Sequence, residues 1–261
     1  MKRILSLQNP RVKQINKLRD KKGRESEKRF VIDYERDLER AVTCGYAIDY
    51  LFYCPALDHN DVTLPAAPVY EVSREIMEKL SYRENPSPVI AVIKQTQHKD
   101  VSYLHEISAS YILGLVNLQK PGNIGALLRS ADAAGFKAVL LIDIALDLYN
   151  PNIIRSSTGA VFLNNIYSIS SATAIDFLHS KTYKIVAAAV EGEKSIFEVD
   201  FTQKSAVIMG TEDRGLDAHW LSQSSSRVRI PMEGVLSDSL NVSVSGALFM
   251  FEALRQRLVS S

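Results

Sequence analysis

The stretch that decides the fold is YILGLVNLQKPGNIGALLR, residues 111–129. Residues 111–116 form a continuous apolar run, which predicts a strand buried on both faces of a parallel sheet. Residues 123–134 then predict a helix. Further apolar runs at 138–142, 185–190 and 206–209 predict more strands of the same kind. Strands that alternate with helices indicate an α/β fold.

The sequence on either side extends this pattern. Residues 240–258 predict a long helix that is apolar around most of its circumference, so it needs cover, which a partner chain would supply. Asn9-Pro10 is typical of a helix start, and predicts a helix through about Asp20. Strand and helix patterns then alternate up to a polar stretch at 94–100. We therefore predict a smaller α/β domain at 1–97, a linker at 98–107 and a larger domain at 108–261.

Charge is distributed unevenly along the 261 residues. The net charge is +1, and no apolar run approaches the roughly 18 residues that a membrane span needs. Residues 1–29 hold 11 basic and three acidic residues, a net of +8, whereas residues 30–107 carry a net of −6. The basic segment is suited to phosphate contacts, or is a solubilising surface helix.

The two cysteines, Cys44 and Cys54, predict no metal site, because they form no CxxC pair and have no histidine cluster nearby. Two free thiols and the lack of a secretory signal favour the cytoplasm.

Three glycine-containing loops follow predicted strands, where α/β sheets bind their ligands. They lie within PGNIGALLRSADAAG (121–135), IMGTEDRGL (208–216) and RIPMEGVLSDSLNVSVSGA (229–247). None fits GxGxxG or GxxxxGK[ST], which disfavours a dinucleotide enzyme and a P-loop NTPase. Any one of them alone reads as an ordinary turn.

Taken together, in this order and spacing, the three segments resemble the motifs of the SpoU, or TrmH-like, branch of the SPOUT RNA methyltransferases. RSSTGAVF (155–162) is similar to the family's intervening segment. The N-terminal region, from ILSLQNPRVKQINKL (4–18) onward, resembles a substrate-binding domain often fused to it. Where many members have Glu-Gly, this chain has Asp33-Tyr34.

The resemblance implies a parallel sheet with a deep trefoil knot, a homodimer built on the C-terminal and first-motif helices, and S-adenosylmethionine held by the second and third loops. It implies methyl transfer to a ribose 2′-hydroxyl of RNA, ribosomal RNA more than transfer RNA. The implied cofactor residues are Met209, Gly210, Thr211, Gly215, Ile230, Met232, Ser239 and Leu240. The expected RNA contacts are Arg155, Lys13, Lys17, Lys21 and Lys22.

The implied catalytic set is Asn123, Arg129, Glu212, Ser239 and Asn241. We assign Arg129 to the 2′-oxygen, where a cation stabilises developing negative charge. It is not a base, because a guanidinium keeps its proton in proteins, so a substrate phosphate or water accepts the hydroxyl proton.

The other members of the set have structural alternatives. Asn123 orients Arg129 or caps the helix, and Glu212 pairs with Arg129, orients a loop or is a solvated charge. One of Ser239 and Asn241 caps the last helix while the other reaches ribose or cofactor.

Two other functions stay open at this stage. One is an RNA-binding protein of the same fold that has lost catalysis, although the intact catalytic set argues against it. The other is an enzyme for a small phosphorylated metabolite, bound where Lys120-Pro-Gly-Asn123 opens a helix.

Overall fold

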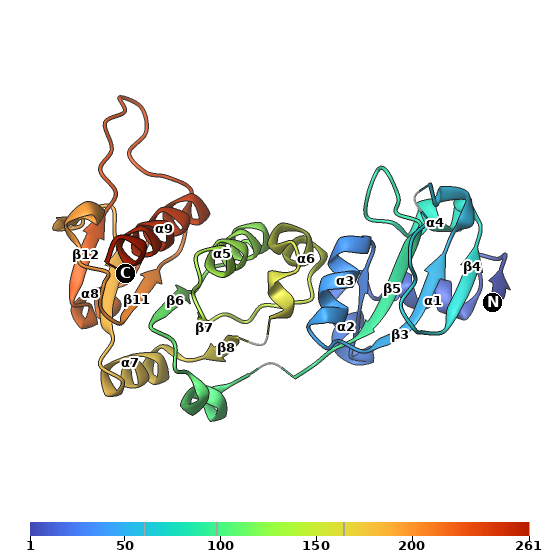
Figure 1. Cartoon of the computed structure of the whole chain (residues 1–261), viewed down its shortest axis with the longest axis horizontal. Helices are drawn as coiled ribbons and strands as arrows, with labels where there is room; N and C mark the ends of the chain where they lie inside the picture. The colour runs from blue at the N-terminus through green and yellow to red at the C-terminus, as the bar shows by residue number, and fades with distance from the viewer. Residues whose placement is uncertain (60, 98, 164, 261) are drawn as a thin grey trace. The chain divides into compact units, whose positions relative to one another are not determined.

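The computed structural model describes residues 1–59, 61–97, 99–163 and 165–260 (Figure 1). Contacts divide the chain into two compact units. The first holds Met1–Gln97 together with Asp147–Phe162, and the second holds His98–Leu146 and Leu163–Ser261. Within the described ranges no helix is long and apolar enough to cross a membrane.

The first unit is built on a mixed five-stranded sheet with the order β1-β4-β3-β5-β2. Strand β5 runs antiparallel to both β3 and β2, and the other pairs are parallel. The strands are Lys2–Ile4 (β1), Arg29–Ile32 (β2), Ile48–Tyr53 (β3), Val69–Val72 (β4) and Val89–Lys94 (β5). The helices are Pro10–Lys17 (α1), Lys21–Glu27 (α2), Glu35–Thr43 (α3), Arg74–Leu80 (α4) and Pro151–Ser157 (α6).

The helix predicted from Asn9-Pro10 is present as α1, but it ends at Lys17, short of the predicted end near Asp20, and a second helix that was not predicted, α2, follows it. Asn9 caps α1 as predicted, because its side chain accepts a hydrogen bond from the backbone of Arg11 at 2.9 Å. The break lies after Lys17, whose carbonyl oxygen would be 1.9 Å from a Cβ atom at Gly23. Only glycine allows α2 to fold back so closely onto the end of α1.

Residues 147–162 pack with the first unit through one buried ion pair and an aromatic stack. Arg24 and Asp147 are 3% and 9% exposed, and their side chains meet at 2.6 Å. The rings of Phe30 and Tyr149 stack with centroids 4.3 Å apart, and the ring of Phe162 stacks with that of Phe30 at 5.9 Å. Arg24, one of the eleven basic residues of the N-terminal segment, is thus not available to a ligand.

The second unit is built on a parallel seven-stranded sheet with the order β10-β12-β9-β11-β6-β7-β8, which confirms the predicted α/β class. The strands are Tyr111–Val116 (β6), Ala138–Ile142 (β7), Ile166–Ile169 (β8), Lys184–Ala188 (β9), Lys194–Ser195 (β10), Ser205–Met209 (β11) and Ser226–Arg229 (β12). The helices are Pro121–Ala133 (α5), Ser171–Ser180 (α7), Ala218–Gln223 (α8) and Val242–Ser260 (α9).

Residues 99–106 are part of this unit as well. Lys99 forms a bridge with Tyr167 at the edge of β8, and a 3-10 helix spans Val101–Glu106. Its Leu104 is 7% exposed and lies in the hydrophobic core.

The strand order places a switch point between β6 and β11. After β6 the chain proceeds to β7 and β8 on one side, whereas β11 and β9 lie on the other. Connections that leave in opposite directions open a crevice at the carboxyl ends of the two central strands, where α/β proteins bind ligands. The loop of the first motif follows β6, and the loop of the second follows β11.

Helices α5 and α9 pack against each other beside this crevice. They approach so closely that a Cβ atom at Gly246 would lie 2.3 Å from a methyl group of Leu127. The close contact holds α5, which lies within the first motif, against α9, which begins within the third.

Candidate active site

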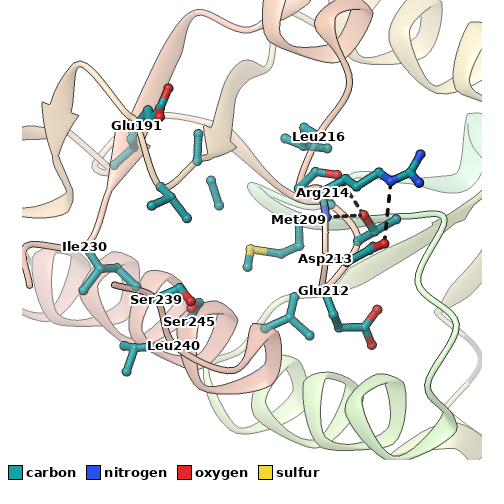
Figure 2. A pocket seen from close by; sticks show the side chains of 18 of the residues that line it. Glu191, Met209, Glu212, Asp213, Arg214, Leu216, Ile230, Ser239, Leu240 and Ser245 are labelled. Atoms are coloured by element: carbon teal, nitrogen blue, oxygen red, sulfur yellow. Dashed lines mark hydrogen bonds and ion pairs between the residues drawn. The ribbon is translucent and has the colours of Figure 1, made fainter. Parts of the chain in front are cut away.

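A pocket of about 440 Å³ opens at the carboxyl ends of β9, β11 and β12. Its walls are the ends of these strands, the loops of the second and third motifs, and the first turns of α9. In Figure 2, Ile230, Ser239 and Leu240 lie opposite Glu212 and Leu216. The volume lies in the range of small-molecule sites.

All eight predicted cofactor residues line this pocket. The sequence analysis missed the wall formed by Ala188, Ala189, Val190 and Glu191, and also Val242, Ser245 and Phe249 of α9. The available signal was the position of residues 188–191 at the carboxyl end of the apolar run 185–190, next to the strand of the second motif.

The loop of the second motif exposes backbone to the pocket. The backbones of Thr211 and Gly215 exchange two hydrogen bonds, of 3.0 and 3.1 Å. A Cβ atom at Gly210 would lie 2.1 Å from the carbonyl carbon of Gly215, which itself has φ +67°. The close approach therefore requires glycine at position 210 and the positive φ favours it at 215, and the closed loop is preorganised for a ligand.

Most of the charged residues that line the pocket are acidic. It contains Glu191, Glu212, Asp213 and Asp238, with Arg214 as the basic residue. Arg214 lies 3.7 Å from Asp213, and both side chains are exposed. The pKa of Asp213 is lowered by its own backbone N–H and by the Thr211 hydroxyl, so this carboxylate stays charged. The excess of negative charge suits a ligand with positively charged groups.

A chain of hydrogen bonds joins the three motifs at the edge of the pocket. The Asn123 side-chain amide donates to Glu212 Oε1 at 2.8 Å, and the Asn241 amide donates to Asn123 Oδ1 at 3.2 Å. Asn123 lies in the first turn of α5 and is not its cap, a position that Lys120 holds. Asn123, Glu212 and Asn241 together are named the amide relay below.

Asn241 is also the residue that caps the last helix. Its side-chain oxygen accepts bonds from the backbone and the hydroxyl of Ser243, at 2.9 and 2.6 Å. Ser239 lines the pocket instead, and its hydroxyl donates to Asp238 at 3.2 Å. The capping role thus belongs to Asn241, and the contact of Ser239 with ribose or cofactor stays a prediction.

The structure does not bring Arg129 into the pocket lining. It lies on α5 with its side chain exposed, and within the described ranges no hydrogen bond or ion pair engages it. Glu212 accepts from Asn123 and makes no ion pair with Arg129 among those residues. Arg129 is therefore available to a ligand that approaches from outside.

The predicted RNA contacts all belong to the first unit. Lys13 and Lys17 lie on α1, Lys21 and Lys22 on α2, and Arg155 on α6. Lys17 pairs with Glu27 at 2.8 Å, and its hydrogen bond is the main cause of the lowered pKa of that carboxyl. Lys21 lies 3.7 Å from Glu25. Within the described ranges, no group of three or more His, Cys, Asp or Glu residues could hold a metal ion.

Comparison with known proteins identifies the family. The SpoU rRNA Methylase family matches residues 110–251, which include every residue of the pocket, and the MRM3-like substrate binding domain matches residues 9–91. The chain belongs to the SpoU rRNA methylase family. The relationship predicted from the three motifs is thereby confirmed.

Relatives of this SpoU methylase align over nearly its whole length. The 23S rRNA (guanosine(2553)-2'-O)-methyltransferase RlmP of Bacillus subtilis is 27% identical and covers 96% of this chain and 98% of its own. A crystal structure of an RNA 2'-O ribose methyltransferase is 38% identical, with a TM-score of 0.84 over 98% of this chain and 99% of the other. An AdoMet-bound rRNA methyltransferase from Sinorhizobium meliloti is 27% identical, with a TM-score of 0.84 over 97% of each chain.

Proposed function

We propose that this SpoU-family chain transfers a methyl group from S-adenosylmethionine to a ribose 2′-hydroxyl of ribosomal RNA. The observation that carries the proposal is the amide relay, which joins all three motifs at the edge of a pocket of suitable size. The relatives support the substrate, because RlmP is named as a 23S rRNA 2'-O-methyltransferase.

The pocket residues fit S-adenosylmethionine in shape and charge. The glycine loop at 210–215 offers backbone groups, Met209, Ile230, Met232 and Leu240 offer apolar surface, and the acids suit a sulfonium and an ammonium group. The bound cofactor supplies an activated methyl group, so the reaction needs no metal. The chain must then align the attacking oxygen and exclude competing water.

In this proposal the chain's own residues position the attacking ribose. Arg129 holds the 2′-oxygen by a charge-assisted hydrogen bond and favours its developing negative charge. The amide relay fixes the first turn of α5 relative to the other two motif loops. The proton leaves to a substrate phosphate or to water, because the arginine keeps its own.

We extend the proposal to the domains, the assembly and the compartment. Residues 1–97 bind RNA and 108–261 catalyse in the cytoplasm, except that residues 147–162 pack with the RNA-binding unit and the predicted connector 98–107 packs with the catalytic unit. The chain is a knotted homodimer, in which α9 and α5 meet a second copy. Exposed Val244, Leu248 and Phe251, at 48%, 44% and 47%, support an interface on α9.

The decisive experiment is mapping of 2′-O-methyl sites in total RNA with and without this protein. We expect one or a few ribosomal sites to disappear in its absence. Sites lost from transfer RNA alone would favour the tRNA alternative. Purified protein that binds S-adenosylmethionine but methylates no RNA would favour the silent RNA-binding protein. Saturable binding of S-adenosylmethionine without binding of other nucleotides would exclude the phosphorylated-metabolite enzyme.

A further inference from the structure

The first unit contains an arginine–aromatic cluster outside the predicted site residues. Tyr34 lies at the start of α3, and the guanidinium carbon of Arg83 lies 3.9 Å from the centroid of its ring. The guanidinium carbon of Arg36 lies 5.1 Å from the same centroid. We name Tyr34, Arg36 and Arg83 the Tyr34 cluster.

Two acidic residues, Asp33 and Asp37, lie beside the arginines of this cluster. Asp33 accepts hydrogen bonds from the Tyr82 backbone at 2.8 Å and from the Ser81 hydroxyl at 3.2 Å. Asp37 is 3% exposed and lies 3.5 Å from Arg36. Asp33 thus holds the loop after α4 against the start of α3, whereas Asp37 holds Arg36 within α3. Part of the acidic segment 30–107 thus supports the arginines and does not face outward.

The guanidinium of Arg83 has N–H groups that donate no hydrogen bond within the described residues. Its Nε is buried without a hydrogen-bond partner, and its nearest carboxylate oxygen, from Asp33, is 4.0 Å away. Within the described ranges its side chain, 29% exposed, donates no hydrogen bond, whereas Arg29 donates to Asp49 at 2.6 Å. A partly buried guanidinium with five N–H groups and no acceptor favours a ligand rich in oxygen.

Two arginines around one aromatic ring match the chemistry of an unpaired nucleotide. Guanidinium groups bind phosphate oxygens, and guanidinium and aromatic planes both stack on exposed bases. Charge alone attracts paired and unpaired RNA alike, but a base can stack on a side chain only when it is unpaired. We propose that the Tyr34 cluster binds an unpaired nucleotide of the RNA substrate. This inference rests on the proposed function, and assigns part of its substrate selection to the first unit.

The test compares two synthetic RNAs without cofactor: a hairpin with an unpaired loop, and the same stem as a continuous duplex. We expect Arg83→Gln and Tyr34→Leu each to weaken binding of the hairpin about tenfold and of the duplex less than about twofold. Arg83→Lys keeps the charge but loses the plane, so it should still lose hairpin affinity. The control is Arg74→Gln on α4, an exposed arginine paired with Glu78, which should change neither.

Circular dichroism confirms that each variant is folded. Unchanged hairpin binding in Arg83→Gln and Tyr34→Leu, or an equal loss on both RNAs, would overturn the inference. The proposed function is tested separately, by whether the wild-type chain methylates ribosomal RNA. An active wild type with unaffected variants would leave that function standing and remove only this site.

Discussion

Removing the acceptor of the amide relay gives the sharpest prediction. In Glu212→Ala the Asn123 amide loses its charged partner at 2.8 Å. A hydrogen bond to a charged group contributes about 1.5–3 kcal/mol, which corresponds to roughly 10- to 150-fold in kcat/KM if the relay holds the transition-state geometry. Glu212→Gln keeps a neutral acceptor, so its loss should be about fivefold. Asn123→Asp places two carboxylates together and should be at least as damaging as Glu212→Ala.

The assay is single-turnover methyl transfer to ribosomal RNA, with cofactor affinity measured by calorimetry. Combining Glu212→Ala with Asn123→Ala should cost less than the sum of the two single changes, because both remove the same bond. The matched control is Asp176→Asn, an exposed acid on α7 outside the pocket, which should be neutral. Equal activity of Glu212→Ala and wild type, or fully additive losses, would refute the relay as a positioning device.

Further predictions concern the other charged groups. Arg129→Ala should abolish methyl transfer, a loss of at least roughly 100-fold, with fold and dimer intact; near-wild-type turnover on RNA would reject its assignment. Four lysines, Lys13, Lys17, Lys21 and Lys22, should be neutralised together. This change should weaken RNA binding and reduce the slope of log affinity against log salt concentration, whereas an unchanged slope would show that these lysines do not contact RNA. Asp147→Asn leaves Arg24 buried without its counter-charge and should destabilise the first unit by about 3–5 kcal/mol in urea denaturation; a cost below about 1 kcal/mol would contradict this. A hydrogen bond from Arg255 lowers the pKa of Glu252, so this carboxylate stabilises the fold above its unfolded pKa, near 4.5, and the gain is lost as pH falls through the lowered value. Glu252→Gln should therefore be less stable than wild type at pH 7, and the difference should shrink as pH falls below about 4.5; a difference independent of pH would count against it.

The sequence predicts the elements whose burial is complete. Residues 111–116 and 138–142 are strands with the predicted bounds, because strands covered on both faces are apolar throughout. Strand β8 was missed, since it has only four residues and Ser168 within it is exposed. Helix α2 was missed because its only buried residues are Gly23 and Arg24, which give no apolar periodicity.

The candidate site also contains features that the sequence predicted and features that it did not. The eight predicted cofactor residues lie within the loops of the second and third motifs, and all of them line the pocket, because local sequence determines these loops. The hydrogen bond between Asn123 and Glu212 was not predicted, because 89 positions separate the two residues and only the strand order brings them together. One partner predicted for Glu212 was Arg129, which lies on α5 together with Asn123. The sequence thus predicted the correct helix for the partner of Glu212 but not the correct residue.

The small net charge of the chain conceals where RNA affinity must come from. Arg24 forms an ion pair with Asp147, Arg29 with Asp49, and Lys17 with Glu27. The net charge of +8 for residues 1–29 therefore overstates the charge that a ligand meets. Conversely, the net charge of −6 for residues 30–107 includes Asp33 and Asp37. Their side chains are only 16% and 3% exposed and lie next to Arg83 and Arg36. Charge that is paired inside the protein contributes little to a field outside it. RNA binding by this chain should therefore depend on individual arginines whose side chains donate no hydrogen bond within the described residues, Arg83 and Arg129 among them, more than on the sign of any segment.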